Sequence, residues 1–324
     1  MKAVRIHRFG DESVLQYEDA PDPAPGPADV LIRVRAASVN RGDLGRRAGT
    51  YITNLALPFI IGWDIAGDIV QAGAEVTNAH VGQRVAAQLP KGGYAELAVA
   101  PGAVVVPLPD NVSYDEAASL PVAFLTAWVA LLETAKLQKG ETALIQSASS
   151  GVGMAGVQIA KHVAGATVYA TTGTDEKAAR ALTLGADVCI NYAKRDFLAE
   201  VMRLTAGAGV NVALDMVGGE VFARSQKALG QGGRLISVGR SSGQPPVVDS
   251  QLAQAKAHRI VTGWALGALR NPEESARDLA QIVDLISKGT LKTVVDRVFP
   301  LSQAGAAHRY LAGRNQFGKI ILRP

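Results

Sequence analysis

An apolar strand that runs into a glycine-rich turn and then into a helix constrains this chain more than any other feature. Residues 142–146 read TALIQ and residues 147–156 read SASSGVGMAG. Gly151, Gly153 and Gly156 fit the spacing G-x-G-x-x-G, in which glycines allow a tight turn, close approach of backbone N–H groups to a pyrophosphate, and close helix–strand packing. A purely structural glycine turn is the alternative. The residues expected to contact a dinucleotide here are Ser149, Ser150, Gly151, Val152 and Gly153.

Strands and helices alternate on both sides of this turn. After it the chain reads ATVYATT, DEKAARALTLG, DVCINY, FLAEVMRLT, NVALDMVG, EVFARSQKAL and RLISVG, in which apolar runs alternate with helical patterns. Apolar strands that alternate with helices predict βαβ units and a parallel sheet covered on both faces. The fold class expected for this part of the chain is therefore α/β, with a Rossmann doubly wound parallel sheet.

The end of the second strand of this array bears on the choice between NAD and NADP. An acid about 20 residues beyond the glycines favours NAD, and Asp175 lies near that place. The strand is expected to end at Thr172-Gly173, however, which puts Asp175 in the first turn of the next helix, where the helix dipole explains an acid. Thr172, Gly173, Thr174 and Lys177 are then suited to a 2′-phosphate. NADP(H) is the expected cofactor, and a merely solvated Lys177 is the alternative.

The first 110 residues show no helical periodicity. Short β-rich runs separated by Pro, Gly and Asp, among them the apolar run FIIGWDIAGDIV (59–70), predict an antiparallel, barrel-like domain. At Ser113 the pattern changes, because Ser113 and Glu116 have the spacing of a capping box, and a helix is expected from there to about Ala135. The β-rich tail, with a helix at about 272–288, is expected to rejoin the first domain. The predicted domains are residues 1–121 with 262–324, and residues 122–261.

Composition excludes several classes of function. The net charge of +4 comes without a run of Lys or Arg, so no nucleic-acid partner is expected. Cys189 is the only cysteine, which excludes an intrachain disulfide and a zinc cluster of thiolates. No run approaches 18 apolar residues and the first ten residues form no signal sequence, so no membrane partner and a cytoplasmic location are expected.

Blocks along nearly the whole chain resemble one protein superfamily. The chain is similar to medium-chain dehydrogenases/reductases, in particular the zinc-independent quinone oxidoreductase family. The resemblance implies a GroES-like β-barrel catalytic domain beside the Rossmann domain, with the active site in the cleft between them. The blocks that carry it are ASVNRGDLGRRAGTY (37–51), GWDIAGDIVQAGAEVTNAHVGQRV (62–85), GGYAELAV (92–99), LPVAFLTAW (120–128), SASSGVGMAGVQIAK (147–161), LGADVCINY (184–192), VALDMVGG (212–219) and GGRLISVG (232–239).

The same resemblance bears on zinc. Zinc-dependent members have Cys where this chain has Asn40, His-Glu where it has Trp63-Asp64, and an additional segment with four cysteines. Catalytic zinc needs three protein ligands, and neither Asn40 nor Trp63 is a plausible one. No metal is therefore expected. Asp64, an acid in an apolar run, is expected to pair with a cation or backbone amides, and Arg41, Arg46 and Arg47 are the candidate cations.

Residues matching family positions give the expected catalytic site. Asn40 is expected to donate to the substrate oxygen or the nicotinamide ribose, with a loop-capping role as the alternative. Tyr51 is expected to stack on the substrate or donate its hydroxyl, with simple packing as the alternative. Asp43 is expected to orient the loop by pairing with Arg46 or Arg47. Gly45 replaces a second tyrosine found in some bacterial relatives, which implies a wider pocket.

Further family positions point to the cofactor and to the end of the chain. A position beneath the nicotinamide is matched by Thr126, one beside the 2′-phosphate by Tyr192, and the loop after the fifth Rossmann strand by Gly239 and Arg240. Each has a packed or solvated side chain as the alternative. Three residues near the end of the chain are weaker candidates for closing the cleft: Asn315, Phe317 and Lys319.

The expected activity is hydride transfer from NADPH to a quinone or an α,β-unsaturated carbonyl compound. Without a Lewis acid, alcohol oxidation is disfavoured, whereas a developing enolate or hydroquinone oxygen needs only hydrogen-bond donors and a later proton. The alternatives are a 2-enoyl thioester reductase and a non-catalytic, crystallin-like NADPH-binding protein. The resemblance also implies a homodimer, with the strand around His258–Leu266 pairing across a two-fold axis.

Overall fold

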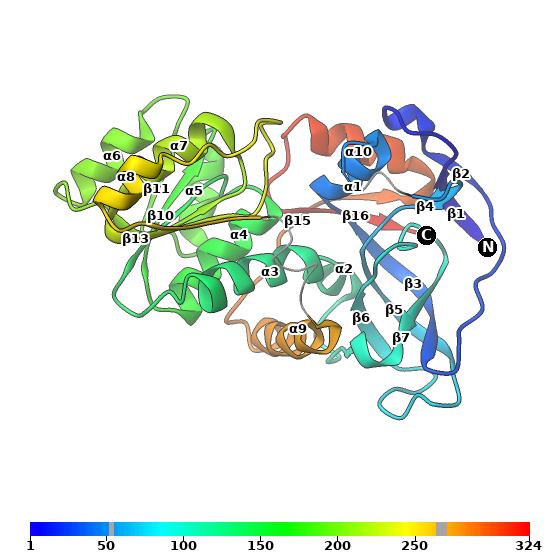
Figure 1. Ribbon diagram of the computed structural model, residues 1–324. Coiled ribbons are helices and arrows are strands. Elements are labelled where there is room, and N and C mark those ends of the chain that lie inside the picture. Colours follow the sequence, from blue (N-terminus) through cyan, green and yellow to red (C-terminus); the bar gives the residue numbers. More distant parts are fainter. Residues whose placement is uncertain (52–54, 264–270) are drawn as a thin grey trace. The chain divides into compact units, whose positions relative to one another are not determined.

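A computed structural model describes residues 1–51, 55–263 and 271–324, and the chain divides into two compact units (Figure 1). The first unit comprises Met1–Val122, Asn271–Gly289 and Thr293–Pro324. The second unit comprises Ala123–Arg270 and Thr290–Lys292. No helix in the described ranges combines the length and the apolar character needed to cross a membrane.

The first unit is built mainly from antiparallel strands. Among the described residues its larger sheet has seven strands, in the order β15-β16-β3-β5-β6-β8 with β7 paired to β3, and a smaller sheet has the order β2-β1-β4. The strands are β1 (Lys2–Ile6), β2 (Gln16–Asp19), β3 (Asp29–Val39), β4 (Phe59–Ile60), β5 (Asp64–Ala72), β6 (Arg84–Gln88), β7 (Leu97–Pro101), β8 (Val106–Pro107), β15 (Val295–Pro300) and β16 (Lys319–Arg323). The helices are η1 (Glu12–Val14), α1 (Arg41–Ala48), η2 (Gly102–Val104), α2 (Tyr114–Ala118), α9 (Pro272–Ser287), η5 (Leu301–Gln303) and α10 (Ala304–Ala312).

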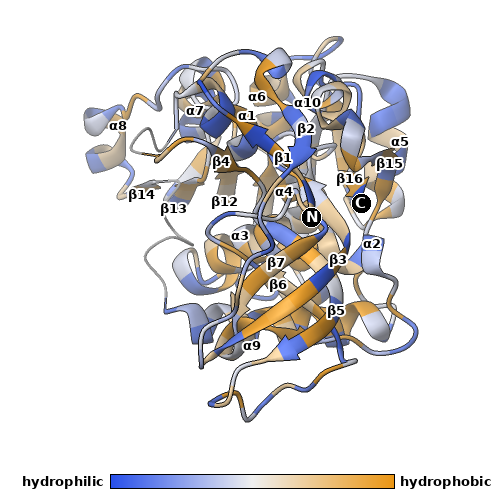
Figure 2. Ribbon diagram, turned by 90° about the vertical axis from the view of Figure 1, so that its right-hand side faces the viewer, coloured by the Kyte–Doolittle hydropathy of each residue, from blue (hydrophilic) through white to orange (hydrophobic). Residues whose placement is uncertain are grey.

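The core of the first unit lies on one face of its strands. Along β3, Val30, Ile32 and Val34 are buried while Arg33 and Arg35 alternate with them. This period of two puts the apolar side chains of β3 on one face. Figure 2 shows that hydrophobic residues are frequent along β3, β5, β6 and β7. β16 pairs antiparallel with β3, which brings the last strand of the chain beside the end of β3.

The second unit is an α/β unit with a parallel sheet. Its strand order, β11-β10-β9-β12-β13-β14, is that of a Rossmann fold, and the order reverses between β9 and β12, where ligands bind in such sheets. The strands are β9 (Thr142–Ile145), β10 (Thr167–Thr172), β11 (Val188–Asn191), β12 (Val210–Asp215), β13 (Leu229–Ser237) and β14 (Arg259–Thr262). The helices are α3 (Pro121–Trp128), η3 (Val129–Thr134), α4 (Gly151–Gln158), η4 (Ile159–Val163), α5 (Asp175–Thr183), α6 (Phe197–Leu204), α7 (Gly219–Lys227) and α8 (Ser250–Ala255). The predicted parallel sheet is confirmed.

Two predicted elements are interrupted in the structure. The helix expected from Ser113 to about Ala135 has the predicted capping box, but α2 ends at Ala118 and α3 begins at Pro121. Proline lacks an N–H and disfavours helical backbone at the residue before it, so one helix cannot run through it. The apolar run from Phe59 is divided at Gly62, whose φ of +105° ends β4 before β5 begins.

Candidate active site

Asn40 lies at the point where β3 ends and α1 begins. Its backbone has φ −116° and ψ 155°, the extended conformation of an N-cap residue. Asp43, in the first turn of α1, accepts the backbone N–H of Asn40 at 2.8 Å and the hydroxyl of Tyr94 at 3.2 Å. The Asp43 carboxylate therefore closes the first turn of the helix and fixes the direction in which the chain leaves β3.

The expectation that Asp43 pairs with Arg46 or Arg47 is wrong. Arg46 donates to the carbonyl oxygen of Pro90 at 2.6 Å, and Arg47 donates to that of Gly10 at 3.3 Å. Both side chains leave α1 toward loop carbonyl groups, while the carboxylate of Asp43 turns back to its own helix terminus. Asp43 does orient this segment, but it does so through the helix cap and Tyr94.

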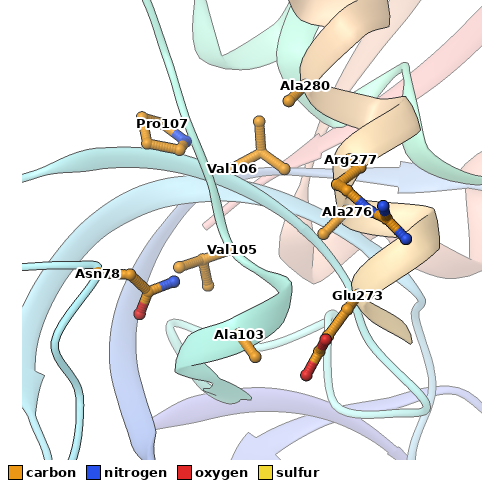
Figure 3. A pocket seen from close by; sticks show the side chains of 9 residues that line it. All are labelled: Asn78, Ala103, Val105, Val106, Pro107, Glu273, Ala276, Arg277 and Ala280. Atoms are coloured by element: carbon orange, nitrogen blue, oxygen red, sulfur yellow. The ribbon is translucent and has the colours of Figure 1, made fainter. Parts of the chain in front are cut away.

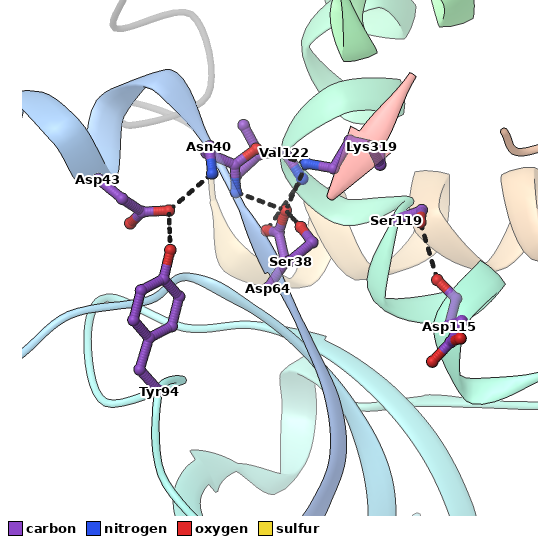
Figure 4. A network of polar contacts seen from close by, with 9 residues as sticks. All are labelled: Ser38, Asn40, Asp43, Asp64, Tyr94, Asp115, Ser119, Val122 and Lys319. Atoms are coloured by element: carbon purple, nitrogen blue, oxygen red, sulfur yellow. Dashed lines mark hydrogen bonds and ion pairs between the residues drawn. The ribbon is translucent and has the colours of Figure 1, made fainter. Parts of the chain in front are cut away.

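Asp64, the first residue of β5, is the centre of a buried polar cluster (Figure 4). Its Oδ2 accepts the Ser38 hydroxyl at 2.9 Å and the Asn40 side-chain amide at 2.8 Å, and its Oδ1 accepts the backbone N–H of Val122 at 3.1 Å. The Nζ of Lys319 lies 3.5 Å from Oδ2. The prediction that Asp64 is paired is confirmed.

The expected cation was wrong. The ion pair that the structure shows for Asp64 is made by Lys319, and not by Arg41, Arg46 or Arg47. Lys319 is the first residue of β16, and its Nζ also donates to Oδ1 of Asn40 at 2.6 Å. The antiparallel pairing of Ile320 with Val39 brings it there. A sequence signal for this contact exists: Lys319 opens the apolar run KIIL much as Asp64 sits in another apolar run, and each buried charge needs an opposite one.

Burial shapes the titration of this cluster. Removal from water raises the pKa of Asp64 and lowers the pKa of Lys319, and the charge of each opposes the shift of the other. Burial also raises the pKa of Asp43 to about 7, against the hydrogen bond from the Asn40 N–H. The Oδ1 atom of Asp43 is buried without a hydrogen-bond partner, which agrees with a carboxyl group that is not strongly held in its ionised form.

A chain of hydrogen bonds connects Asp43 to the interior of the unit. Nε2 of His308 lies 3.1 Å from the Tyr94 hydroxyl, and Nδ1 lies 3.4 Å from Nη1 of Arg47. A guanidinium group can only donate, so Nδ1 of His308 accepts a hydrogen bond from Arg47 and Nε2 carries the ring hydrogen. The Nε2–H group then donates to the Tyr94 hydroxyl, and that hydroxyl donates to Asp43. Burial lowers the pKa of His308 to about 3, so the ring is neutral in the folded protein.

Trp63 and Tyr51 form an aromatic corner beside α1. Their rings meet edge to face with centroids 5.8 Å apart, and the guanidinium of Arg46 lies 4.2 Å from the centre of the Trp63 ring. A Cβ atom at Gly42 would come within 2.3 Å of the indole, so only glycine fits there. A Cβ atom at Gly45 would lie 2.8 Å from Cβ of Tyr51. Tyr51 therefore packs against Gly45, and the wider pocket expected there stays a prediction.

The donor atoms in this region do not fit zinc. Of Asn40, Trp63 and Asp64, only Asp64 has a common zinc-ligand group, and its oxygens already face an ammonium, a hydroxyl and two N–H groups. Across the described ranges, no three or more His, Cys, Asp or Glu side chains are grouped so that they could hold a metal ion.

In the second unit, the glycine-rich turn lies between β9 and α4, as expected. Ser150 is the N-cap of α4 and accepts the backbone N–H of Gly153 at 3.0 Å. Helix geometry leaves the N–H groups of Gly151 and Val152 without an intrahelical partner. A Cβ atom at Gly153 would come within 2.1 Å of the carbonyl oxygen of Ser147, so the helix packs against the turn as only glycine permits. This terminus has the form of a phosphate site.

The residues expected to bind the 2′-phosphate lie where β10 ends and α5 begins, and beside that turn. One of them, Thr172, has a different role from the expected one. Thr174 is the N-cap of α5, and Lys177 lies in the first turn of that helix. The Tyr192 ring lies over Gly173, where a Cβ atom would meet the Tyr192 hydroxyl at 2.9 Å. Thr172, however, is buried and donates its hydroxyl to the carbonyl oxygen of Thr174 at 3.2 Å. Thr172 therefore supports the turn and does not present its hydroxyl to a ligand.

Asp175 is the acid that bears on the choice between NAD and NADP, and its carboxylate is bonded to other side chains of the protein. Its Oδ1 accepts the side-chain amide of Asn191 at 2.7 Å, and its Oδ2 forms an ion pair with Lys194. The hydrogen bonds from Asn191 and Lys194 lower the pKa of Asp175. Asn191 and Lys194 were not expected from the sequence. Asn191 is the last residue of β11, the neighbour of β10, and Lys194 lies three positions beyond it, which explains how both reach this acid.

For the remaining residues expected to bind the cofactor, the structure gives their position and exposure. Gly239 follows β13, and a Cβ atom there would lie 3.1 Å from the carbonyl oxygen of Met216. Arg240 is exposed and lies against Gly218, after β12. Both loops are at the carboxyl ends of their strands, the edge at which parallel sheets bind ligands. Thr126 is half-buried in α3.

A pocket elsewhere in the first unit lies between α9 and the segment from η2 to β8 (Figure 3). Its lining is mostly Ala, Val and Pro, with Asn78, Glu273 and Arg277 as its polar members. It contains none of the residues expected from the sequence. The side chain of Asn78 donates to the carbonyl oxygen of Gly102 at 2.8 Å, which gives it a role in the loop itself.

Comparisons with known proteins agree with both units. Residues 26–110 match the alcohol dehydrogenase GroES-like domain, and residues 184–322 match a family described as zinc-binding dehydrogenase. A quinone oxidoreductase of Pseudomonas aeruginosa is 33% identical over 100% of this chain and 99% of its own. A 2-haloacrylate reductase of Burkholderia is 32% identical, covering 99% and 98%. The crystal structure of Escherichia coli quinone oxidoreductase complexed with NADPH superposes with a TM-score of 0.93 at 28% identity, covering 100% of both chains.

These matches confirm the predicted fold class, with a Rossmann parallel sheet and a GroES-like domain. They also confirm the family expected from the sequence blocks. The chain is an oxidoreductase that belongs to the medium-chain dehydrogenase/reductase superfamily, in its quinone oxidoreductase family.

Proposed function

We propose that the protein is an NADPH-dependent, zinc-independent reductase that transfers hydride to a quinone or an α,β-unsaturated carbonyl compound. The observation that carries the proposal is the buried Asn40 amide, held by Asp64 and Lys319 in a cluster whose donor atoms do not suit zinc. The names of the relatives support both substrate classes, since one acts on quinones and another reduces a haloacrylate.

The end of β10 supports NADP(H) over NAD(H). An acid that binds the ribose hydroxyls directs its carboxylate toward them, whereas the carboxylate of Asp175 is directed toward Asn191 and Lys194. Lys177 in the first turn of α5 and the helix N-terminus supply positive charge for a 2′-phosphate. The NADPH complex of the Escherichia coli relative supports the same choice.

The cofactor, when bound, supplies a hydride from its nicotinamide ring. The protein's part in the chemistry is to stabilise the oxygen that becomes negative as hydride reaches a quinone ring or the β-carbon of an enone. Asn40 donates an N–H to that oxygen, and water supplies the proton that completes the enol or hydroquinone. Tyr51 lies next to the Trp63 ring and offers an aromatic face to a planar substrate. Asp43 keeps Asn40 in place and does not transfer a proton.

In this proposal the cofactor-binding domain comprises residues 122–261, and the substrate-binding domain comprises residues 1–121 and 262–324. It also includes a homodimer. Within the described residues β14 is the last strand of its sheet and bonds on one side to β13, so its other side is a site for pairing with a second copy. Part of the segment expected to pair, residues 264–266, lies outside the described residues.

A panel assay tests the function. Purified protein with NADPH or NADH is given 1,4-quinones, alkenals, a haloacrylate and enoyl thioesters, and cofactor oxidation is followed at 340 nm. We expect turnover of quinones or alkenals with NADPH. Preference for the thioesters would establish the alternative reductase. Tight NADPH binding without turnover of any compound would establish a non-catalytic cofactor-binding protein and reject the proposal.

A further inference from the structure

The side-chain amide of Asn40 is held at both of its polar ends. Its Nδ2 donates to Asp64 at 2.8 Å, and its Oδ1 accepts from Nζ of Lys319 at 2.6 Å. An amide that is rotated by half a turn would put Nδ2 against an ammonium group and Oδ1 against a carboxylate. Both contacts would then be repulsive, so the orientation of this amide follows from its partners.

In this orientation one N–H group of the Asn40 side chain remains available for a ligand. An amide nitrogen carries two hydrogen atoms, and in the described part of the chain Asp64 is the one acceptor that the structure shows for Nδ2 of Asn40. The Oδ1 atom is turned toward Lys319. Asn40 therefore presents an N–H donor to a ligand and withholds its acceptor, which selects for an oxygen that gains negative charge.

We infer that Lys319 is a positioning residue: together with Asp64 it fixes the Asn40 amide as a donor toward the substrate oxygen. This inference rests on the proposed function of Asn40 and names the partners that make it possible. The geometry is a closed triangle, since Nζ of Lys319 also lies 3.5 Å from Oδ2 of Asp64. All three side chains are buried, so water does not compete for these contacts.

The triangle joins elements that are distant in sequence. Asn40 follows β3, Asp64 begins β5 and Lys319 begins β16, and β3 pairs with both of the other strands. The strand pairing places the three residues, and the ion pair sets the direction of the amide. A cluster that merely held the strands together would not require the amide of Asn40 between the two charges, because Asp64 and Lys319 already face each other.

A charge-neutral double variant, Asp64→Asn with Lys319→Met, tests the inference. Removing both charges avoids leaving one buried and unpaired, which is the usual reason for such variants to unfold. Thermal melting shows whether the variant is folded, and NADPH fluorescence shows whether it binds cofactor. Lys288→Met is the matched control, because it removes an exposed Lys–Asp contact of 2.6 Å in the same unit.

If Lys319 and Asp64 position Asn40, kcat of the double variant falls about 10- to 100-fold while the dissociation constant of NADPH stays within about twofold. Asn40→Ala then lowers kcat strongly in the wild-type background and little in the double variant, since the residues act as one unit. A purely structural cluster gives the opposite result. The folded double variant would keep wild-type kcat, and Asn40→Ala would have the same effect in both backgrounds, which would overturn the inference.

A measurement without substrate separates this inference from the proposed function. In protein labelled with [¹⁵N]asparagine, the Asn40 side-chain signal is assigned by its loss in Asn40→Ala. We expect one hydrogen of the wild-type amide to exchange slowly with water, because it is bonded to Asp64, and both hydrogens to exchange fast in the double variant. Equal exchange of both hydrogens in the wild type would reject the inference, whatever the substrate panel shows.

Discussion

At the scale of single residues, the cofactor site shows how contacts within the protein can direct a carboxylate away from a ligand. Asp175 lies where an NAD-binding acid is sought, and sequence spacing alone cannot tell whether its oxygens are free. The structure shows them bonded to Asn191, the last residue of the neighbouring strand β11, and to Lys194, in the loop that follows it. The choice of cofactor therefore depends on contacts between neighbouring loops as well as on the residue at one position.

Lys177 offers the first prediction at this scale. Lys177→Glu places a negative charge in the first turn of α5, beside the expected 2′-phosphate, and Asp175 remains engaged. We expect KM for NADPH to rise about tenfold or more, since one lost charge-assisted contact and one new repulsion together exceed about 1.4 kcal/mol. KM for NADH, which lacks that phosphate, should change by less than about threefold. Steady-state kinetics with both cofactors measure this difference.

The control for this variant is Lys227→Glu, which makes the same change of charge at an exposed position on α7. Its two KM values should match those of the wild type. If Lys177→Glu raised KM for NADPH and NADH by the same factor, recognition of a 2′-phosphate by Lys177 would be excluded.

At the scale of elements, periodicity and turn residues predicted most of the strands and helices of both units. Helix α1 was missed, because its sequence RGDLGRRA has two glycines, four charged residues and a single large apolar side chain, and so lacks an amphipathic pattern. Two further predictions failed where a single residue interrupts a pattern that otherwise continues. Pro121 separates α2 from α3 although the surrounding residues favour one helix, and Gly62 separates β4 from β5 within one apolar run. Gly62 adopts this backbone beside Tyr94, where a Cβ atom would come within 2.4 Å of the ring. That contact comes from a later segment and has no local signal.

The junction of β9 and α4 gives a prediction about an element. In Gly153→Ala the added methyl group would lie 2.1 Å from the carbonyl oxygen of Ser147, and this neighbour is backbone that cannot rotate away. We expect α4 to shift relative to the turn, with a loss of about 1–3 kcal/mol in the free energy of unfolding. Cofactor affinity should fall at least tenfold, because the first N–H groups of the helix move with it. Thermal melting and NADPH fluorescence titration measure the two effects.

Gly305→Ala is the control, because the nearest described atom to a Cβ atom there is the carbonyl oxygen of Glu12 at 3.2 Å, so the added methyl group requires a shift of only a few tenths of an ångström. It should change neither quantity appreciably. Wild-type NADPH affinity in a folded Gly153→Ala variant would show that the turn does not bind the pyrophosphate.

At the scale of the whole molecule, the candidate active site depends on pairings that no local pattern contains. The sequence identified Asn40, Asp43 and Asp64 as residues of interest, but it suggested nearby arginines as their partners. The actual partner of Asp64, Lys319, is 255 positions away and reaches it because β16 pairs with β3. Two isolated charges in apolar runs predict that each needs a partner, and only the sheet topology shows that they are partners of each other.

Two buried groups of the same hydrogen-bond chain should affect stability with opposite dependence on pH. His308 has a folded pKa of about 3, below its ordinary value of 6.5, so between these limits the unfolded state binds more protons and stability rises with pH. Asp43 has a folded pKa of about 7, above its ordinary 3.8, so between these limits the folded state binds more protons and stability falls as pH rises. Between about pH 4 and 6.5 the two contributions oppose each other.

Single variants separate these contributions. In His308→Gln the side chain no longer titrates, so the wild type should gain stability relative to this variant by about 1.4 kcal/mol for each pH unit from pH 4.5 to 6. In Asp43→Asn the difference should have the opposite sign, with the wild type losing stability relative to the variant over the same interval. Urea unfolding of the three proteins at several pH values gives both slopes. A difference that does not vary with pH in either variant would mean that the altered residue binds the same number of protons in the folded and unfolded states, and would contradict its burial as the cause of a shifted pKa.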